Sequence, residues 1–242
     1  RLLDSDATEF QALLATFSIN ITEFFRDFHF YEAFYSKIIP ELYSQAQALG
    51  REVRVWSAGC ASGEEPYTIA LLFAEAAESL QGLRCKVIAT DVSAKALDTA
   101  RAGVYAQASL KNVPPEIMAK YFVRTADGKY QVSPRLKAMT SFEQGNLSTM
   151  TPPKAIDAVF CRNVLMYFDK ETQNKIQTKF YQSLRSRGFF ILGQSEALMG
   201  EPTRMFETVM ARERIYRRKE SITPSPSSPA STGNMRQQQE AA

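Results

Sequence analysis

The sequence predicts an α/β protein with a doubly wound sheet and a small inserted antiparallel β-subdomain. Three observations carry this prediction. Short apolar, β-rich runs alternate with longer Ala- and Leu-rich runs of helical spacing between residues 53 and 192. The rhythm is interrupted at residues 104–140, where Asp127-Gly128 separates two short β-rich runs in the pattern of a hairpin. Residues 206–210 and 214–218 are then predicted to close the sheet as an antiparallel pair.

The first strand, turn and helix of this core are the most informative part of the chain. Residues 53–57 alternate in polarity and predict a strand, which is followed by two glycines, Gly59 and Gly63. Such glycines allow a positive φ or a close approach of the backbone to a ligand. A helix is predicted to begin at Glu64, and residues 85–90 form a second strand that ends at Asp91.

This strand, glycine turn, helix, strand and acid follow the order of a nucleotide-binding unit, in which Asp91 would accept two hydroxyls of a ribose. The same turn is also compatible with a plain connection. Neither dinucleotide nor P-loop glycine spacing is present. Carboxylates at Glu64 and Glu65 would repel a pyrophosphate at the helix start but suit a ligand with a cationic part. A nucleoside joined to a cationic amino acid describes S-adenosylmethionine.

Composition limits the class of protein. Hydrophobic residues make up 45% and charged residues 23%, and the net charge of +3 does not indicate a nucleic-acid partner. No apolar run is long enough to span a membrane, so no membrane insertion is expected. Three isolated cysteines predict reduced thiols in a cytoplasmic protein. His29 is the single histidine, which argues against metal sites and against a Ser-His-Asp hydrolase; we expect it to pack against neighbouring aromatic rings.

Several further elements are predicted from periodicity. Residues 1–15 are expected to be helical, and residues 28–49 form an amphipathic helix that Pro40 breaks or kinks. Residues 136–142 are expected to continue the insert as a strand. A helix over residues 170–187 is expected to stop at Gly188.

Polar residues follow two of the predicted buried strands. Arg162 and Asn163 come after the strand at residues 156–161, and Gly-Gln-Ser-Glu (193–196) follows the strand at residues 189–192. Open α/β sheets bind their ligands at the carboxyl ends of the strands, so both segments are expected at the ligand-binding edge.

With these pieces in place, the chain resembles the CheR family of chemotaxis receptor methyltransferases. The resemblance rests on Asn-Ile-Thr-Glu-Phe-Phe-Arg (20–26), Val-Trp-Ser-Ala-Gly-Cys-Ala-Ser-Gly-Glu-Glu-Pro-Tyr (55–67), Ala-Thr-Asp (89–91), Phe-Cys-Arg-Asn-Val-Leu-Met-Tyr-Phe (160–168) and Gly-Gln-Ser-Glu (193–196), in the family's order. It implies a Rossmann-like sheet, and S-adenosylmethionine as methyl donor with S-adenosylhomocysteine as product. The implied substrate is a glutamate side chain on the helical cytoplasmic domain of a chemoreceptor, which would become a methyl ester.

The resemblance also implies site residues. Arg26 and Tyr167 would be catalytic, close to the transferred methyl group. Purely structural roles for these two residues remain open: Arg26 could form a surface ion pair with Asp27 or Glu23, and Tyr167 could be a packed aromatic. The cofactor-binding set would be Asn20, Thr22, Arg26, Ala58, Gly59, Glu65, Asp91, Asn146, Leu147, Asn163 and Val164.

The predicted domain organisation has three parts. Residues 1–49 form a truncated helical segment, residues 50–218 the methyltransferase domain with its insert at 104–140, and residues 219–242 a disordered tail. We expect a monomer. Two alternatives remain open: a non-catalytic cofactor sensor of the same fold, and a methyltransferase that acts on another protein or a small acid.

Overall fold

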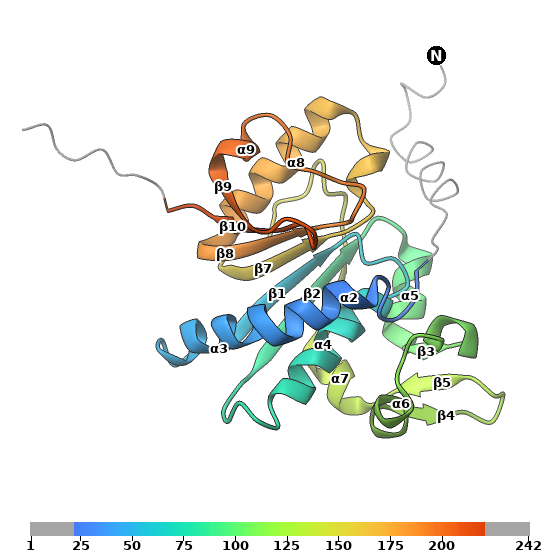
Figure 1. Cartoon of the computed structure of the whole chain (residues 1–242). Coiled ribbons are helices and arrows are strands. Elements are labelled where there is room, and N and C mark those ends of the chain that lie inside the picture. Colours follow the sequence, from blue (N-terminus) through green and yellow to red (C-terminus); the bar gives the residue numbers. More distant parts are fainter. Residues whose placement is uncertain (1–21, 221–242) are drawn as a thin grey trace, which may run out of the picture.

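A seven-stranded sheet forms the centre of the molecule, and a separate three-stranded antiparallel sheet lies beside it (Figure 1). The computed structural model describes residues 22–220. The large sheet has the order β6 (Thr140–Gln144), β2 (Cys85–Asp91), β1 (Val53–Ala58), β7 (Ile156–Cys161), β8 (Leu184–Leu192), β10 (Ile215–Arg218) and β9 (Phe206–Met210). The first five strands are parallel, and β10 and β9 are antiparallel to their neighbours. The predicted fold class and the closing hairpin are confirmed.

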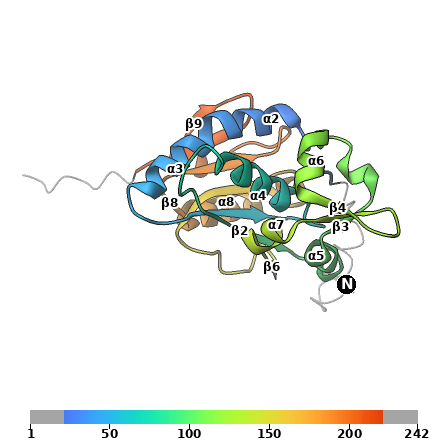
Figure 2. The ribbon, with the colours of Figure 1, turned by 90° about the horizontal axis from the view of Figure 1, so that it is seen from below.

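Helices cover both faces of the large sheet. On one face lie α2 (Phe28–Ala33), α3 (Ile39–Gln47) and α4 (Glu64–Ala76), which Figure 2 shows in front of the sheet. Their apolar side chains share a core with Val55 and Phe160. On the other face α8 (Lys170–Ser183) packs through Phe180 against Trp56 and Phe190. Because adjacent residues of a strand point to opposite faces, a fully buried strand such as β7 is apolar at nearly every position.

Pro40 does not break the amphipathic helix, so of the predicted break or kink the break is wrong. Residues 28–47 continue without interruption through a π-helical turn, η1 (Phe34–Ile38), and Pro40 lies in the first turn of α3. The Ile39 N–H donates to the Phe34 carbonyl five residues earlier. A proline ring clashes with the carbonyl four residues before it, so widening the preceding turn fits the proline into the helix.

The insert begins after α5 (Ala94–Ala102), which packs against β2 and β6. Its small sheet has the order β3 (Val104–Tyr105), β5 (Tyr130–Val132) and β4 (Phe122–Arg124), accompanied by η2 (Gln107–Leu110) and α6 (Pro115–Tyr121). The hairpin predicted at Asp127-Gly128 is confirmed by the pairing of β4 with β5.

The predicted strand over residues 136–142 is wrong in its first half. Residues Pro134–Met139 form helix α7, and the strand β6 begins only at Thr140. Ser133 is extended and Pro134 opens the helix, where its fixed φ suits the first turn and its missing N–H is not needed. β6 joins the edge of the large sheet beside β2 instead of extending the insert.

The helix predicted over residues 170–187 ends earlier than expected. α8 stops at Ser183, and Leu184 already pairs with Ile156 at the start of β8. Gly188 therefore lies inside a strand, where a Cβ atom would come within 3.0 Å of the Arg185 carbonyl oxygen. Burial of Leu184 against its neighbouring strand overrides the helical pattern of the local sequence.

The remaining connection between α8 and the closing hairpin contains the short helix α9 (Pro202–Met205). Within residues 22–220, none of the helices has the length and apolar character needed to cross a membrane.

Candidate functional site

A cavity of about 460 Å³ opens at the carboxyl ends of β1, β2, β6 and β7. β1 lies between β2 and β7, so the order of the strands reverses here, which is where doubly wound sheets bind ligands. The volume lies in the usual range for small-molecule sites. The segment before α2 and the short helix η3 (Leu165–Tyr167) complete the walls.

The glycine turn after β1 forms the floor of this cavity. Gly59 and Gly63 have φ values of 85° and 97°, as the sequence predicted. A Cβ atom on Gly59 would lie 2.5 Å from Cγ2 of Val164, so glycine is required for the loops after β1 and β7 to approach each other. The Gly59 N–H donates to the Thr90 carbonyl over 2.8 Å, which ties the turn to β2.

Asp91 lies at the end of β2 and lines the cavity. Its two carboxylate oxygens accept the Ala61 N–H over 2.7 Å and the Ser93 N–H over 2.9 Å. Each oxygen keeps a further acceptor site. The carboxylate is therefore held in place by the backbone and can still accept hydrogen bonds from ligand hydroxyls.

Glu65 and Arg162 form a charged pair in the cavity wall. The Ser57 hydroxyl donates to Glu65 over 2.7 Å, and Nη1 of Arg162 lies 3.7 Å from the other carboxylate oxygen. Burial raises the pKa of Glu65, and the charge of Arg162 opposes this shift. The pair places one carboxylate and one guanidinium along the same cavity.

Arg162 also reaches the segment before α2. Its Nη2 lies 2.6 Å from an Asp27 carboxylate oxygen and donates to the Arg26 carbonyl over 3.3 Å. Its Nη1 donates to the Tyr31 hydroxyl, and its guanidinium lies 4.5 Å from the ring centre of Phe30. The sequence placed Arg162 at a strand end without a role, because the partners that it reaches before and in α2 are more than 130 residues away in the chain.

Glu64 does not face the cavity, although the sequence argument treated it together with Glu65. It is buried under the glycine turn, where the Ser62 hydroxyl donates to it over 2.8 Å. Burial raises the pKa of Glu64 to about 7. Of the two acids that open α4, only Glu65 contributes a carboxylate to the cavity.

Glu64→Gln is expected to change how stability depends on pH. Because the folded-state pKa is raised from 4.5 to about 7, the unfolded state loses its proton first as pH rises. Glu64 contributes fully to the free energy of unfolding below about pH 4.5; this contribution falls as pH rises and is absent above about pH 7. The glutamine side chain does not titrate, so the free energy of unfolding of the variant rises relative to that of the wild type by up to about 3 kcal/mol across that interval.

Urea unfolding at about pH 5 and about pH 8 measures this difference. Glu116→Gln, in the exposed first turn of α6, controls for removing a charge near a helix start. Parallel pH profiles of the wild type and the Glu64 variant would contradict the assignment of Glu64.

Arg26, Met166 and Tyr167 are among the residues that line the cavity. Met166 is 49% and Tyr167 57% exposed, although both are large side chains. Arg26 lies between two residues of positive φ, Phe25 at 55° and Asp27 at 62°. This uncommon backbone is held by the buried ring of Phe25 and by the bonds of Arg162 described above.

Most of the predicted site residues lie at this one cavity. Asn20 lies outside the described residues, and Ala58 is fully buried in the core that contains Trp56. Sequence reasoning did not assign roles to Arg162 or Glu196, because both act through contacts between distant loops. The predicted residues that line the cavity are Thr22, Arg26, Gly59, Glu65, Asp91, Asn146, Leu147, Asn163, Val164 and Tyr167.

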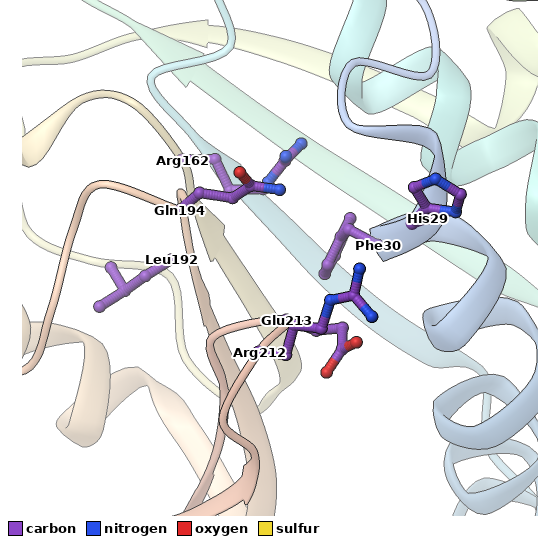
Figure 3. Close-up of a pocket in the computed structure, with 7 residues that line it drawn as sticks. All are labelled: His29, Phe30, Arg162, Leu192, Gln194, Arg212 and Glu213. Atoms are coloured by element: carbon purple, nitrogen blue, oxygen red, sulfur yellow. The ribbon is translucent and has the colours of Figure 1, made fainter.

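A second hollow of about 50 Å³ lies on the other side of Arg162 (Figure 3). Figure 3 shows His29 and Phe30 of α2 facing Arg212 and Glu213 of the β9–β10 turn. His29 contacts a neighbouring aromatic ring as predicted, since its ring lies edge-to-face with Phe28 at 6.4 Å between centres, but its side chain is 86% exposed and also lies beside Glu32. This hollow is far smaller than a nucleoside requires, so it does not compete with the main cavity as cofactor site.

Within the described part of the chain, no cluster of three or more His, Cys, Asp or Glu side chains could hold a metal ion. The side chains that line the main cavity supply three carboxylates, two guanidiniums, two phenols, two amides, one hydroxyl, one thiol and several apolar groups.

Known proteins resemble this chain in sequence over most of its length. Residues 20–215 match the family model described as CheR methyltransferase, SAM binding domain. The chain is 38% identical over 192 residues to a chemotaxis protein methyltransferase of Borreliella burgdorferi, covering 78% of this chain and 68% of that protein. It is 37% identical over 202 residues to the chemotaxis protein methyltransferase of Escherichia coli, covering 81% and 68%.

Solved structures with a partial likeness include the glycopeptide N-methyltransferase MtfA. It shares 15% identity at a TM-score of 0.39, over 63% of this chain and 55% of that one. An S-adenosylmethionine-dependent methyltransferase from Mesorhizobium loti shares 18% identity at a TM-score of 0.33, over 58% and 46%.

Proposed function

The chain belongs to the CheR methyltransferase family, and we propose that it methylates glutamate side chains on the cytoplasmic domain of chemoreceptors. It is a methyltransferase of chemotaxis that uses S-adenosylmethionine. The observation that carries the finer proposal is the meeting of two kinds of group at one cavity. Glu65, Asp91, Arg26 and Tyr167 all line it, and we propose that the part formed by Arg26, Met166 and Tyr167 is the acceptor side, where the glutamate substrate binds.

The residues of the cavity fit the cofactor. Glu65 and Asp91 can accept hydrogen bonds from hydroxyl and ammonium groups, while Leu147 and Val164 offer apolar contact to a flat base. When bound, S-adenosylmethionine supplies an electrophilic methyl group on a sulfonium; its transfer to a carboxylate oxygen yields a methyl ester and S-adenosylhomocysteine.

The acceptor needs no general base. Glutamate has a pKa near 4.3, so it is ionised at neutral pH and its oxygen is already a nucleophile. In this proposal Arg26 holds the incoming carboxylate by charge-assisted hydrogen bonds, and the Tyr167 hydroxyl donates a further one. The arrangement favours alignment of the reacting atoms over proton transfer as the source of rate acceleration.

In this proposal the apolar side chains around the acceptor side help to exclude water from the reacting carboxylate. Met166 and Phe168 line the cavity beside Tyr167. Covering the mouth with a helical substrate would remove water from the glutamate carboxylate, which weakens its solvation and strengthens its attack. The large exposed area of Met166 and Tyr167 in the free protein is consistent with such a contact.

We also propose that the protein acts in the cytoplasm, where the methylated domains of chemoreceptors lie. Cys60, Cys85 and Cys161 are buried and unpaired. Unpaired thiols are typical of proteins from a reducing compartment, which supports this proposal.

Transfer of a tritiated methyl group to receptor-containing membranes tests the proposed function. We expect label on the receptor that is released as methanol by mild base, since methyl esters are base-labile. Membranes without chemoreceptors serve as the control. Calorimetric binding of S-adenosylhomocysteine with no label on any receptor would refute glutamate methylation and favour a sensor.

A further inference from the structure

The carboxylate of Glu196 joins two loops at the edge of the cavity without facing it. One oxygen accepts the N–H groups of Asn163 and Gly193, each over 2.8 Å. The other accepts those of Val164 over 2.8 Å and Leu165 over 2.7 Å. The side chain belongs to the loop after β8, is 5% exposed, and is absent from the lining of either hollow.

The local backbone is built around this carboxylate. Three successive N–H groups, from Asn163 to Leu165, converge on it, and Asn163 has a φ of 60°. Such a turn forms a concave anion-binding surface, and here a side chain of the same molecule fills it. Four backbone N–H groups donate to this carboxylate, and such N–H groups stabilise a negative charge.

Gly193 makes the contact possible. A Cβ atom at this position would lie 2.8 Å from the Asn163 nitrogen and 2.8 Å from the Glu196 carboxylate. Its backbone needs no positive φ, so the requirement for glycine here is steric. The loops after β7 and β8 are therefore locked together at one point.

The loop after β7, which Glu196 holds in place, carries residues that line the cofactor cavity and a residue on the proposed acceptor side. Asn163 and Val164 line the cofactor cavity, and η3, which begins at Leu165, presents Tyr167 on the acceptor side. The Tyr167 N–H donates to the Val164 carbonyl, so a shift of Val164 is passed on to Tyr167.

We propose that Glu196 is a positioning residue for methyl transfer, which acts through the backbone of residues 163–165. It touches neither cofactor nor acceptor; it sets the position of Asn163, Val164 and Tyr167 relative to each other. For Tyr167 the proposal rests on the function proposed above, whereas for Asn163 and Val164 it concerns cofactor binding alone.

Glu196→Gln is the direct test. The amide keeps the size of the side chain, but its NH2 group would face N–H donors and lose the bonds of one oxygen. We expect the Kd of S-adenosylhomocysteine to rise about tenfold by calorimetry. Turnover should fall roughly ten- to a hundredfold, while the KM for the receptor stays within about twofold, because misplacement by less than an ångström slows reaction more than docking.

Asp157→Asn is the matched control. Asp157 is 2% exposed, lies at the opposite end of β7, and accepts the Arg54 N–H as well as an Arg51 guanidinium. Its substitution removes a buried carboxylate at the amino end of β7, away from the cavity lining, so it is expected to lower the melting temperature and to leave cofactor affinity and turnover unchanged.

Gly193→Ala approaches the same contact from the other side and keeps the carboxylate. It should raise the Kd and lower turnover in the same direction as Glu196→Gln, and it decides the question if the glutamine variant does not fold. Both variants binding S-adenosylhomocysteine within about twofold of the wild type would overturn the proposal. A wild type that binds S-adenosylhomocysteine but labels no receptor would refute the proposed function. The Kd values of the variants and the wild type would still show whether Glu196 positions the cofactor-binding residues.

Discussion

Arg162→Lys is expected to lower stability by about 2–3 kcal/mol and to weaken S-adenosylhomocysteine binding by about tenfold or more. Lysine keeps the charge but has one ammonium group in place of a planar fork. It cannot contact Asp27 and Glu65 together while lying over the ring of Phe30. Glu65 would then remain buried with less compensation, and the segment carrying Arg26 would lose the bond to its carbonyl.

Arg217→Lys provides a matched control for this substitution. Arg217 is half-buried where Arg162 is buried, but it likewise lies within reach of two carboxylates, Glu41 and Glu207, and faces the ring of Phe189. It is on β10, outside the cavity lining. Denaturant unfolding should show a loss of stability for both variants, and calorimetry should show weaker cofactor binding for the Arg162 variant alone. Equal cofactor affinities in the two variants would contradict the role given to Arg162.

The second large effect is a division of roles between Asp91 and Arg26. Asp91→Ala removes a carboxylate from the cofactor end of the cavity and its bonds to the glycine turn. We expect the Kd of S-adenosylhomocysteine to rise roughly ten- to a hundredfold. Arg26→Ala should leave that Kd within about threefold and reduce turnover by about a hundredfold, since Arg26 is assigned to the acceptor carboxylate.

Calorimetry measures cofactor affinity, and the tritiated-methyl assay measures turnover. Arg84→Ala removes an exposed arginine next to the amino end of β2, at the end of the sheet opposite the cavity. It controls for the change in net charge caused by Arg26→Ala. If Asp91→Ala and Arg26→Ala weakened cofactor binding equally, the two residues would not divide the site in this way.

Features of the site that depend on residue type and on neighbours along the chain could be predicted from the sequence. The positive φ of Gly59 and Gly63 follows from residue type, and the position of Asp91 follows from the end of a β-rich run. Parallel strands bring their carboxyl ends to one edge, so Asn163 could be expected beside Asp91 without any knowledge of contacts.

Other properties depend on which side chains meet across the fold. Helical spacing does not reveal that Glu65 faces the cavity while Glu64 is buried under the turn. The roles of Arg162 and Glu196 depend on loops that are distant in the chain. The early start of β8 at Leu184 follows from pairing with β7, which overrides local helical preference.

The π-helical turn at Phe34–Ile38 has a consequence for how this chain can vary in length. A π turn is an α-helical turn with one additional residue, so one deletion there would leave a regular helix from α2 to α3. Winding the same residue into a regular α-helix would instead rotate α2 by about 100° relative to α3. Phe30 and Tyr31, which contact Arg162 from α2, would then leave its side. The π turn therefore takes up the additional residue and keeps these aromatic side chains against the arginine that lines the cofactor cavity.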